Sequence, residues 1–254
     1  GTLHLSLDEY PTTFRYVGPE SNLVTRPLMR VNAALLDVNA ETQEFMPYAA
    51  THWAFGADNQ TVYYKLNEHM KWSDGIPCTA DDFVFAWESL CSRDLDDPWC
   101  NNYYDKFKVK KINDYYVSVK YLESNKLPKA SLISKANFSP RPKHFYNGEV
   151  KNGWYNEYNW KIEPTTGPYV VNADKCVQGE MLVVEKVKDW WGHEYPHWKN
   201  RCNIDKVEYK VITGGQDIIE KYFWNGEIDY FDMNIPATWR RCAANENITK
   251  GYVD

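Results

Sequence analysis

Residues 66–90 read LNEHMKWSDGIPCTADDFVFAWESL, and this stretch predicts the end of a strand, a tight turn and a helix. Asp74-Gly75 is a turn signal, because glycine tolerates the positive φ that tight turns require. Thr79 stands where a helix N-cap belongs, and Asp82 gives a variant of the capping box with a carboxylate against the helix dipole. The apolar residues from Phe83 to Leu90 then supply the buried face of a helix of about three turns. This stretch is a packing element and carries no chemistry.

The composition is that of a folded protein that is unusually rich in aromatic residues. With 254 residues, the chain has room for two small domains or one large one. Its 43% hydrophobic residues suffice for a core, and 25% charged residues argue against disorder. Aromatic residues make up 16%, more than most cores need. They predict either a site for amphipathic ligands, such as peptides or sugars, or a core rich in tryptophan.

Charge and hydropathy exclude two classes of partner. The formal net charge is −6, and acidic and basic residues are mixed along the chain without a basic stripe. Nucleic acid is therefore excluded as an expected partner. No apolar run approaches the length of a membrane span.

The six cysteines contain no C-x-x-C pair, so a zinc ribbon or a thioredoxin-like site is not supported. An even number of cysteines fits disulfides in an oxidising compartment, although the sequence does not give their pairing. Cys91 and Cys100 bracket an acidic loop and are the first candidates for a bridge. Buried thiols are the alternative.

Alternating apolar residues and turn signals predict the remaining elements. The expected strands are 3–7, 52–55, 61–66, 107–112, 115–121, 169–172, 181–187, 204–212 and 228–231. The expected helices are 21–30, 126–135, 216–224 and 236–244, with an irregular stretch from 137 to 160. The order of strands and helices after residue 200 predicts at least one crossover unit.

Several motifs now occur in the order found in one protein family. Residues 71–82, KWSDGIPCTADD, are similar to K-F/W-x-D-G-x-P-x-T-A-E-D, and TGPY stands at 166–169. KDWWG at 188–192 is similar to N-x-x-Y/W-W-G, and IDKV at 204–207 and NGEID at 225–229 follow. The chain thereby resembles the family 5 extracellular solute-binding proteins, which serve peptide- and nickel-type ABC transporters. Such an ordered set is specific, because the probabilities of chance matches multiply.

The resemblance implies a mixed α/β fold of the periplasmic-binding-protein type (type II, cluster C). Residues 1–43 and 160–254 would form an incomplete lobe I, and residues 44–159 the small α+β domain inserted in this family. Family members are longer and close two lobes around a ligand. We therefore expect the chain to be an N-terminal half whose second lobe is absent. The tail from 234 to 251 looks nearest to the branch that handles microcin C-like and other oligopeptides.

The same resemblance implies a binding protein and not an enzyme. It would capture oligopeptides in a cleft outside the cytoplasm and deliver them to the permease subunits of an ABC importer, without a cofactor or metal. It would lie in the periplasm after removal of a signal peptide, and would meet the membrane only through the permease or a lipid anchor. An oligosaccharide or a nickel chelate is the alternative cargo, and a carbohydrate-binding module is an alternative class.

Loops at the carboxyl ends of lobe I strands are expected to face the cleft, as they do in open α/β sheets. Backbone groups there could pair with an extended peptide, while aromatic rings shield it from water. For each candidate residue, the alternative interpretation is that its side chain packs locally and does not contact the ligand. The candidate ligand-binding residues are Tyr10, Thr12, Thr13, Phe14, Thr166, Gly167, Tyr169, Asn234 and Trp239.

Residues 193–197 read HEYPH and match the H-E-x-x-H signature of zinc proteases. That chemistry needs both histidines, His193 and His197, on one face of a regular helix, with Glu194 as the general base. Pro196 removes a helix hydrogen bond, so one turn is the most that we expect here. A secreted zinc hydrolase is therefore only a minor alternative. The chain contains neither G-x-S-x-G nor a Gly-rich phosphate loop.

Overall fold

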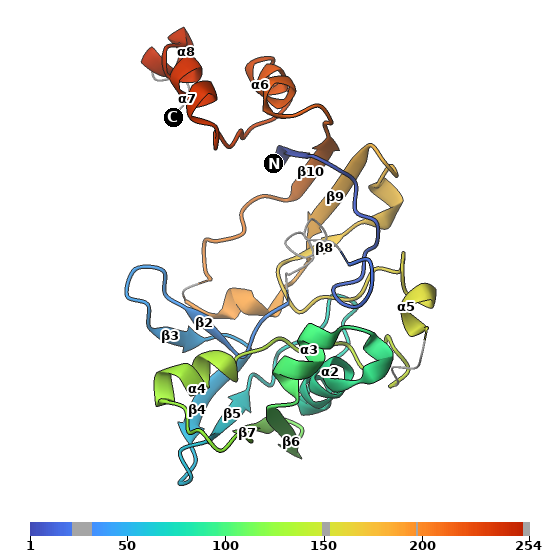
Figure 1. Cartoon of the computed structure of the whole chain (residues 1–254), viewed down its shortest axis with the longest axis vertical. Helices are drawn as coiled ribbons and strands as arrows, with labels where there is room; N and C mark the ends of the chain where they lie inside the picture. Colours follow the sequence, from blue (N-terminus) through green and yellow to red (C-terminus); the bar gives the residue numbers. More distant parts are fainter. Residues whose placement is uncertain (22–31, 149–152, 197, 251–254) are drawn as a thin grey trace. The chain divides into compact units, whose positions relative to one another are not determined.

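The computed structural model describes residues 1–21, 32–148, 153–196 and 198–250 (Figure 1). By packing, the chain divides into two units. Unit 1 comprises Gly1–Tyr10, Val171–Glu185 and Asn203–Asp254, and unit 2 comprises Pro11–Val170 and Lys186–Cys202. The helix expected at 21–30 lies, except for its first residue, outside the described residues.

The described part of unit 2 contains a four-stranded antiparallel sheet in the order β4-β5-β7-β6. Its strands are β4 (Ala50–Phe55), β5 (Thr61–Leu66), β6 (Phe107–Asn113) and β7 (Tyr116–Tyr121). The four strands expected at 52–55, 61–66, 107–112 and 115–121 are confirmed, and they pair as the hairpins β4–β5 and β6–β7. Two short strands, β2 (Leu36–Val38) and β3 (Phe45–Pro47), pair beside this sheet.

The helix predicted from residues 66–90 forms as α2 (Ala80–Cys91). The backbone N–H of Thr79 donates to Asp82 Oδ2 at 2.9 Å, so the capping box is confirmed. Gly75 adopts the expected positive φ of 90°. The other helices of unit 2 are the 3₁₀ turn η1 (Arg93–Leu95), α3 (Pro98–Tyr104), α4 (Lys129–Lys135), α5 (Trp154–Glu157) and the 3₁₀ turn η3 (Trp191–Glu194).

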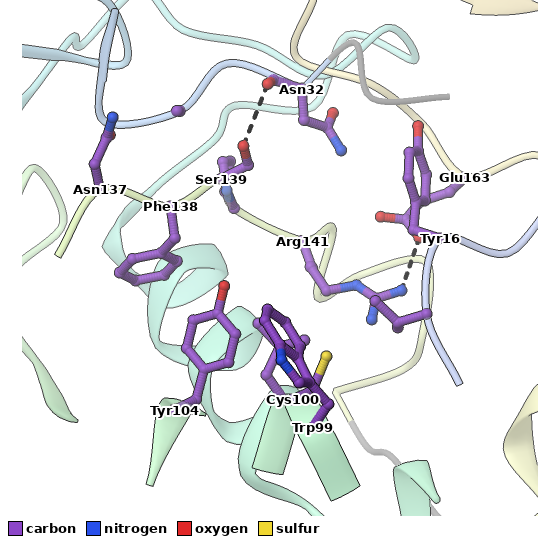
Figure 2. A pocket seen from close by; sticks show the side chains of 14 residues that line it. Tyr16, Asn32, Trp99, Cys100, Tyr104, Asn137, Phe138, Ser139, Arg141 and Glu163 are labelled. Carbon is purple, nitrogen blue, oxygen red and sulfur yellow. Dashed lines mark hydrogen bonds and ion pairs between the residues drawn. The ribbon is translucent and has the colours of Figure 1, made fainter. Parts of the chain in front are cut away.

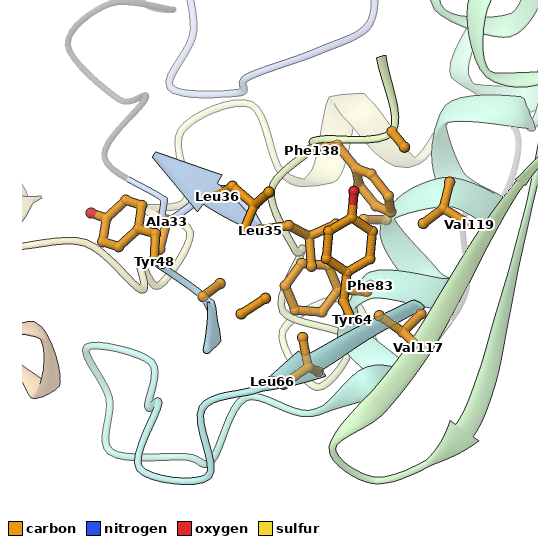
Figure 3. Packing of buried hydrophobic residues seen from close by; sticks show 14 of the residues in the cluster. Ala33, Leu35, Leu36, Tyr48, Tyr64, Leu66, Phe83, Val117, Val119 and Phe138 are labelled. Atoms are coloured by element: carbon orange, nitrogen blue, oxygen red, sulfur yellow. The ribbon is translucent and has the colours of Figure 1, made fainter. Parts of the chain in front are cut away.

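The core of unit 2 lies between its four-stranded sheet and α2 (Figure 3). Tyr64 and Leu66 on β5 and Phe83 on α2 are fully buried there. Leu35 and Phe138 join them from outside these elements, and the backbone N–H of Leu35 donates to the carbonyl of Phe138 at 3.1 Å. The segment around Leu35 therefore packs with unit 2.

Unit 1 contains the sheet β1-β10-β9-β8, in which β1 runs parallel to β10. The strands are β1 (Thr2–Leu7), β8 (Tyr169–Val171), β9 (Met181–Lys186) and β10 (Lys206–Val211). The first two residues of β8 and the last residue of β9 belong to unit 2. Its helical elements are the 3₁₀ turn η2 (Ala173–Lys175), α6 (Gln216–Trp224), α7 (Pro236–Ala243) and α8 (Glu246–Thr249). Among the described residues, no helix is both long and apolar enough to span a membrane.

The strand expected at 228–231 is wrong, and so is the crossover that depended on it. Ile228 is buried beside Ile219, but these residues form no ladder with a neighbouring strand. Asp229 N–H donates to the carbonyl of His4 at 2.7 Å, while His4 N–H donates to the carboxylate of Asp229 at 2.7 Å. The carboxylate of Asp229 thus accepts the N–H of His4, which a second backbone hydrogen bond between the two segments would need.

The expected bridge between Cys91 and Cys100 is also wrong, since the structure describes both residues as thiols. Cys91 ends α2 beside Asp105, and burial together with that carboxylate raises the pKa of its thiol to about 12. Cys100 lies on α3 and packs into a different cluster with Phe85 and Leu90. The two side chains therefore face different surroundings. The predicted lobe boundaries at 43 and 160 differ from the packing units and stay a prediction.

Candidate ligand-binding site

Unit 2 contains a pocket of about 350 Å³, at the small end of the range of ligand sites (Figure 2). Apolar rings form one part of its wall and buried polar groups form another. The segment that ends at residue 21 contributes to it, together with α3, the loop after α4 and the segment before β8. Among the lining residues are Tyr16, Trp99, Tyr104, Phe138, Arg141 and Glu163.

A buried ion pair lies in the polar wall. Arg141 Nη2 donates to Glu163 Oε2 at 3.0 Å and to the hydroxyl of Tyr146 at 2.8 Å. That hydroxyl in turn donates to Glu163 Oε2. Arg141 and Glu163 are only 6% and 3% exposed. Burial alone would lower the pKa of Arg141, but the adjacent Glu163 and Tyr146 raise it above its usual value, so the guanidinium stays charged.

The ion pair leaves one atom of each partner without a hydrogen bond. Within the described part of the chain, Arg141 Nη1 and Glu163 Oε1 have no partner. An unsatisfied buried polar group costs about 1–3 kcal/mol, and more if charged. The pair therefore keeps one unused donor and one unused acceptor, both buried in residues that line the pocket. Burial, and then Glu163, raise the pKa of Tyr16 well above its usual value, so its phenol stays protonated.

The aromatic wall comes from α3. The carboxylate of Asp97 accepts the N–H of Cys100 at 3.1 Å, and Pro98 occupies the first turn, so the D-P sequence fixes the start of this helix. Trp99 is 70% exposed, and its ring stacks on Tyr103 with centroids 5.6 Å apart and an interplanar angle of 11°. An exposed, stacked ring beside a pocket provides an apolar platform.

The N-terminus of α2 positions Arg141. The carboxylate of Asp82 accepts the N–H of Lys143 at 3.0 Å, and the carbonyl of Asp82 accepts the N–H of Arg141 at 3.2 Å. Ser139 Oγ donates to the carbonyl of Asn32 at 3.3 Å. Burial raises the pKa of Asp82 although it accepts these N–H groups. The helix predicted from residues 66–90 thus also positions Arg141 in the pocket wall.

Most candidate residues of the TGPY and Phe14 loops lie in the interior of unit 2. Thr166 is fully buried: its hydroxyl accepts the N–H of Ala33 at 2.9 Å, and its carbonyl accepts the indole N–H groups of Trp190 and Trp191 at 2.8 and 2.7 Å. These contacts join the TGPY and WWG motifs. Gly167 is buried next to Thr166, and its N–H donates to the hydroxyl of Thr165 at 2.9 Å.

The candidate residues around Phe14 differ in exposure. The hydroxyl of the buried Thr13 donates to the carbonyl of Asn159 at 2.9 Å, and the buried Phe14 ring packs edge-on against Trp160 at 5.3 Å. Thr12 is exposed, and its hydroxyl donates to the carbonyl of Glu20 at 2.9 Å. The Thr13 and Phe14 side chains therefore have structural partners.

The remaining candidates are half-buried or exposed. Tyr169 in β8 is half-buried. Tyr10 belongs to unit 1, where burial and then Cys176 raise the pKa of its phenol to about 12. Asn234 accepts a hydrogen bond from Gln216, and Trp239 is 57% exposed. The binding roles of all nine candidate residues stay predictions.

Sequence reasoning missed the pocket residues Tyr16, Trp99, Arg141 and Glu163. Arg141 and Glu163 lie 22 residues apart, with no spacing that indicates a contact. One weak signal was available, since Arg141 stands between two prolines in a run where a cation has no local partner.

The one-turn excursion expected for HEYPH is confirmed. Trp191–Glu194 form the 3₁₀ turn η3, and the backbone is extended at Tyr195. The ring of His193 packs edge-on against Trp190 at 5.4 Å. His197 lies outside the described residues. Among those described, no three His, Cys, Asp or Glu residues are grouped so that they could hold a metal ion.

Comparisons with known proteins give one family. Residues 44–253 match the model of the bacterial extracellular solute-binding proteins, family 5 Middle. A probable ABC transporter-binding protein of Deinococcus radiodurans is 29% identical over 89% of this chain and 39% of its own length. The periplasmic alpha-galactoside-binding protein of Rhizobium meliloti is 27% identical over 85% of this chain and 33% of its own.

Among solved structures, the oligopeptide-binding protein AppA of Bacillus subtilis, in complex with a nonapeptide, superposes with a TM-score of 0.76. It is 24% identical, and the match covers 97% of this chain and 46% of that one. The likeness shows the fold. The chain thus spans less than half the length of the proteins it matches here.

Proposed function

This chain belongs to family 5 of the bacterial extracellular solute-binding proteins, and from that premise we propose that it captures oligopeptides for an ABC importer. The family consists of substrate-binding proteins of ABC transporters, and nothing in the described residues indicates catalysis. Relatives named as periplasmic support a site of action outside the cytoplasm. Capture and delivery to permease subunits are proposed for the whole protein.

The observation that carries the proposal is the pocket in unit 2. Its volume of about 350 Å³ suits one residue of a longer ligand better than a whole ligand. Its wall combines the Trp99 platform with the polar groups of Arg141 and Glu163, as a site for side chains of mixed character requires. The nonapeptide named in the AppA structure supports a peptide as cargo.

A second candidate cargo is an oligosaccharide. Sugar rings stack on exposed aromatic rings, and Trp99 stacked on Tyr103 offers such a surface. The relative named as an alpha-galactoside-binding protein supports this reading. A nickel chelate stays an alternative without an observation in the described residues that favours it.

Titration calorimetry with a mixed peptide library tests the proposal, and native mass spectrometry identifies what is bound. We expect heat on addition of peptides and a mass shift equal to a peptide. If no peptide gave a heat of binding and raffinose did bind, the cargo would be a sugar and not a peptide.

A further inference from the structure

We propose that the pocket is a specificity subsite for one uncharged side chain whose end both donates and accepts hydrogen bonds, such as a tyrosine phenol or a glutamine carboxamide. This inference rests on the proposed function, because it assigns one part of the peptide to the pocket of unit 2. Its main determinants are Arg141, Glu163 and Trp99.

The first argument is charge. Arg141 and Glu163 are the oppositely charged groups that line the pocket, and they pair with each other at 3.0 Å. A carboxylate side chain would have to compete with Glu163 for the guanidinium, and an ammonium group would have to compete with Arg141 for the carboxylate. Either one adds a net charge to a buried site and leaves a group of the native pair poorly matched. An uncharged side chain keeps the pair intact.

The second argument is hydrogen bonding. Arg141 Nη1 and Glu163 Oε1 are buried and have no partner among the described residues. A carboxamide offers both complementary groups, because its oxygen can accept from a guanidinium and its amino group can donate to a carboxylate. A phenol hydroxyl can also accept from one and donate to the other. A purely apolar side chain leaves both atoms unsatisfied, so a polar side chain should bind more tightly than an apolar one.

The third argument is shape. In the view of Figure 2, the rings of Tyr104 and Trp99 from α3 lie between Phe138, in the loop after α4, and the guanidinium of Arg141. An entering side chain would therefore lay its apolar part along aromatic rings and bring its polar end to the ion pair. Trp99 is 70% exposed, so a ligand in the pocket can contact its ring.

Five tripeptides of the form Ala-Xaa-Ala test the subsite on the 254-residue chain, with Xaa as Tyr, Gln, Phe, Glu or Lys. By calorimetry we expect Tyr and Gln peptides to bind on the order of 10-fold more tightly than Glu and Lys peptides, the value of one good hydrogen bond. Phe should fall below Tyr. Equal binding of all five peptides would overturn the subsite and leave the proposed function standing.

Side-chain fragments separate the subsite from the peptide cargo. Ligand-observed NMR with p-cresol, propionamide, propionate and butylammonium should detect only the two neutral fragments. Binding of these two while every peptide is silent would support the subsite and count against peptides as cargo. Absence of binding in both experiments, or tighter binding of the charged fragments, would overturn the inference.

The variant Glu163→Gln tests the role of the ion pair directly. It removes one negative charge and should shift selectivity toward the Glu peptide by about 10-fold relative to the Tyr peptide. The control Glu157→Gln makes the same change in an exposed pair with Lys161 of the same unit. It should leave the ratio unchanged. A purely structural role of Glu163 would lower the affinity of all peptides alike, and that result would contradict the inference.

Discussion

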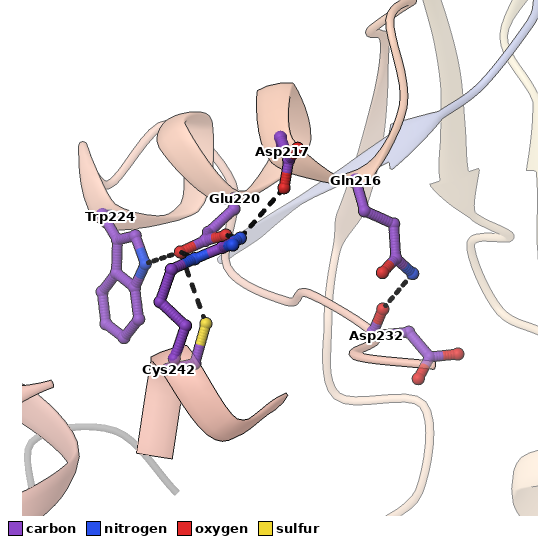
Figure 4. Close-up of polar contacts among 7 residues, drawn as sticks. Gln216, Asp217, Glu220, Trp224, Asp232 and Cys242 are labelled. Atoms are coloured by element: carbon purple, nitrogen blue, oxygen red, sulfur yellow. Dashed lines mark hydrogen bonds and ion pairs between the residues drawn. The ribbon is translucent and has the colours of Figure 1, made fainter. Parts of the chain in front are cut away.

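Most of the buried residues of unit 2 form one large apolar cluster, whereas in unit 1 charged side chains join helix α7 to helix α6. In unit 2, Tyr64, Leu66 and Phe83 are fully buried in that cluster. In unit 1, Arg241 of α7 pairs with Asp217 at 2.9 Å and with Glu220. Figure 4 shows Asp217 and Glu220 on α6 with their polar contacts. Among the described residues, a small set of apolar side chains is buried beside these helices, including Ile219 and Cys242.

The difference predicts different responses to perturbation. Burial of apolar surface contributes about 25 cal/mol per Å² and changes little with salt or pH. Exposed ion pairs contribute about 0–1 kcal/mol each and are screened by salt. The pocket therefore lies in the unit whose structure should be the more rigid, and α7 lies where conditions should matter most.

The largest expected effect is Phe83→Ala in unit 2. Removing a fully buried ring leaves a cavity and should lower the free energy of unfolding by about 3–5 kcal/mol. Trp239→Ala in unit 1 removes a ring that is 57% exposed and should cost within about 0.5 kcal/mol. Urea unfolding followed by circular dichroism measures both. Similar losses in the free energy of unfolding for the two variants would contradict the expected difference between the two units.

Breaking the buried ion pair should cost nearly as much. Arg141→Met leaves Glu163 buried without its cation, and we expect a loss of about 3–5 kcal/mol of stability. The double variant Arg141→Met, Glu163→Met should recover most of that loss, because no charge stays buried alone. A double-mutant cycle in urea measures the coupling. A double variant that is less stable than Arg141→Met would contradict this account.

In unit 1, Arg241→Gln should loosen α7 slightly, since it removes two ion pairs at partly exposed sites that solvent screens. Hydrogen exchange of residues 236–243 measures the change. Lys250→Gln removes only the exposed pair with Glu246 and serves as the control. An unchanged exchange rate at α7 would show that apolar contacts hold it.

The smallest expected effects are changes of local stability with pH, and they have opposite signs in the two units. Hydrogen bonds from Arg241 lower the pKa of Glu220, so its contribution is present above the ordinary glutamate pKa and is lost as pH falls through the lowered value. Burial raises the pKa of Asp82, so its contribution is present below the ordinary aspartate pKa and is lost as pH rises through the raised value.

Hydrogen exchange at about pH 5 and pH 3, corrected for intrinsic rates, should therefore show α7 loosening in acid while the start of α2 does not. Glu220→Gln should remove the acid response of α7, and Asp82→Asn should remove the pH response at the start of α2. Loosening of both helices in acid would contradict the assigned signs.

Local signals in the sequence predicted much of the fold. The capping box of Thr79 and Asp82 and the turn at Gly75 use only neighbouring residues, and both formed as expected. The strand at 228–231 failed because the side chain of Asp229 takes the hydrogen bond that strand pairing requires. No local pattern indicates that choice.

The site was harder to predict than the fold. The ligand contact expected at Thr166 stays a prediction, and no sequence pattern indicates that its carbonyl accepts hydrogen bonds from the two tryptophans of the WWG motif. The pair of Arg141 and Glu163 arises only when α2 fixes the loop after α4, which is a long-range consequence of packing. Sequence spacing carries no information about such a contact.

We propose above that the pocket of unit 2 receives part of a captured peptide. Hydrogen exchange of the chain with and without saturating Ala-Tyr-Ala tests it most directly. We predict protection at α3 and at residues 137–141, with no change at α7. Protection confined to unit 1, or none anywhere, would contradict the claim.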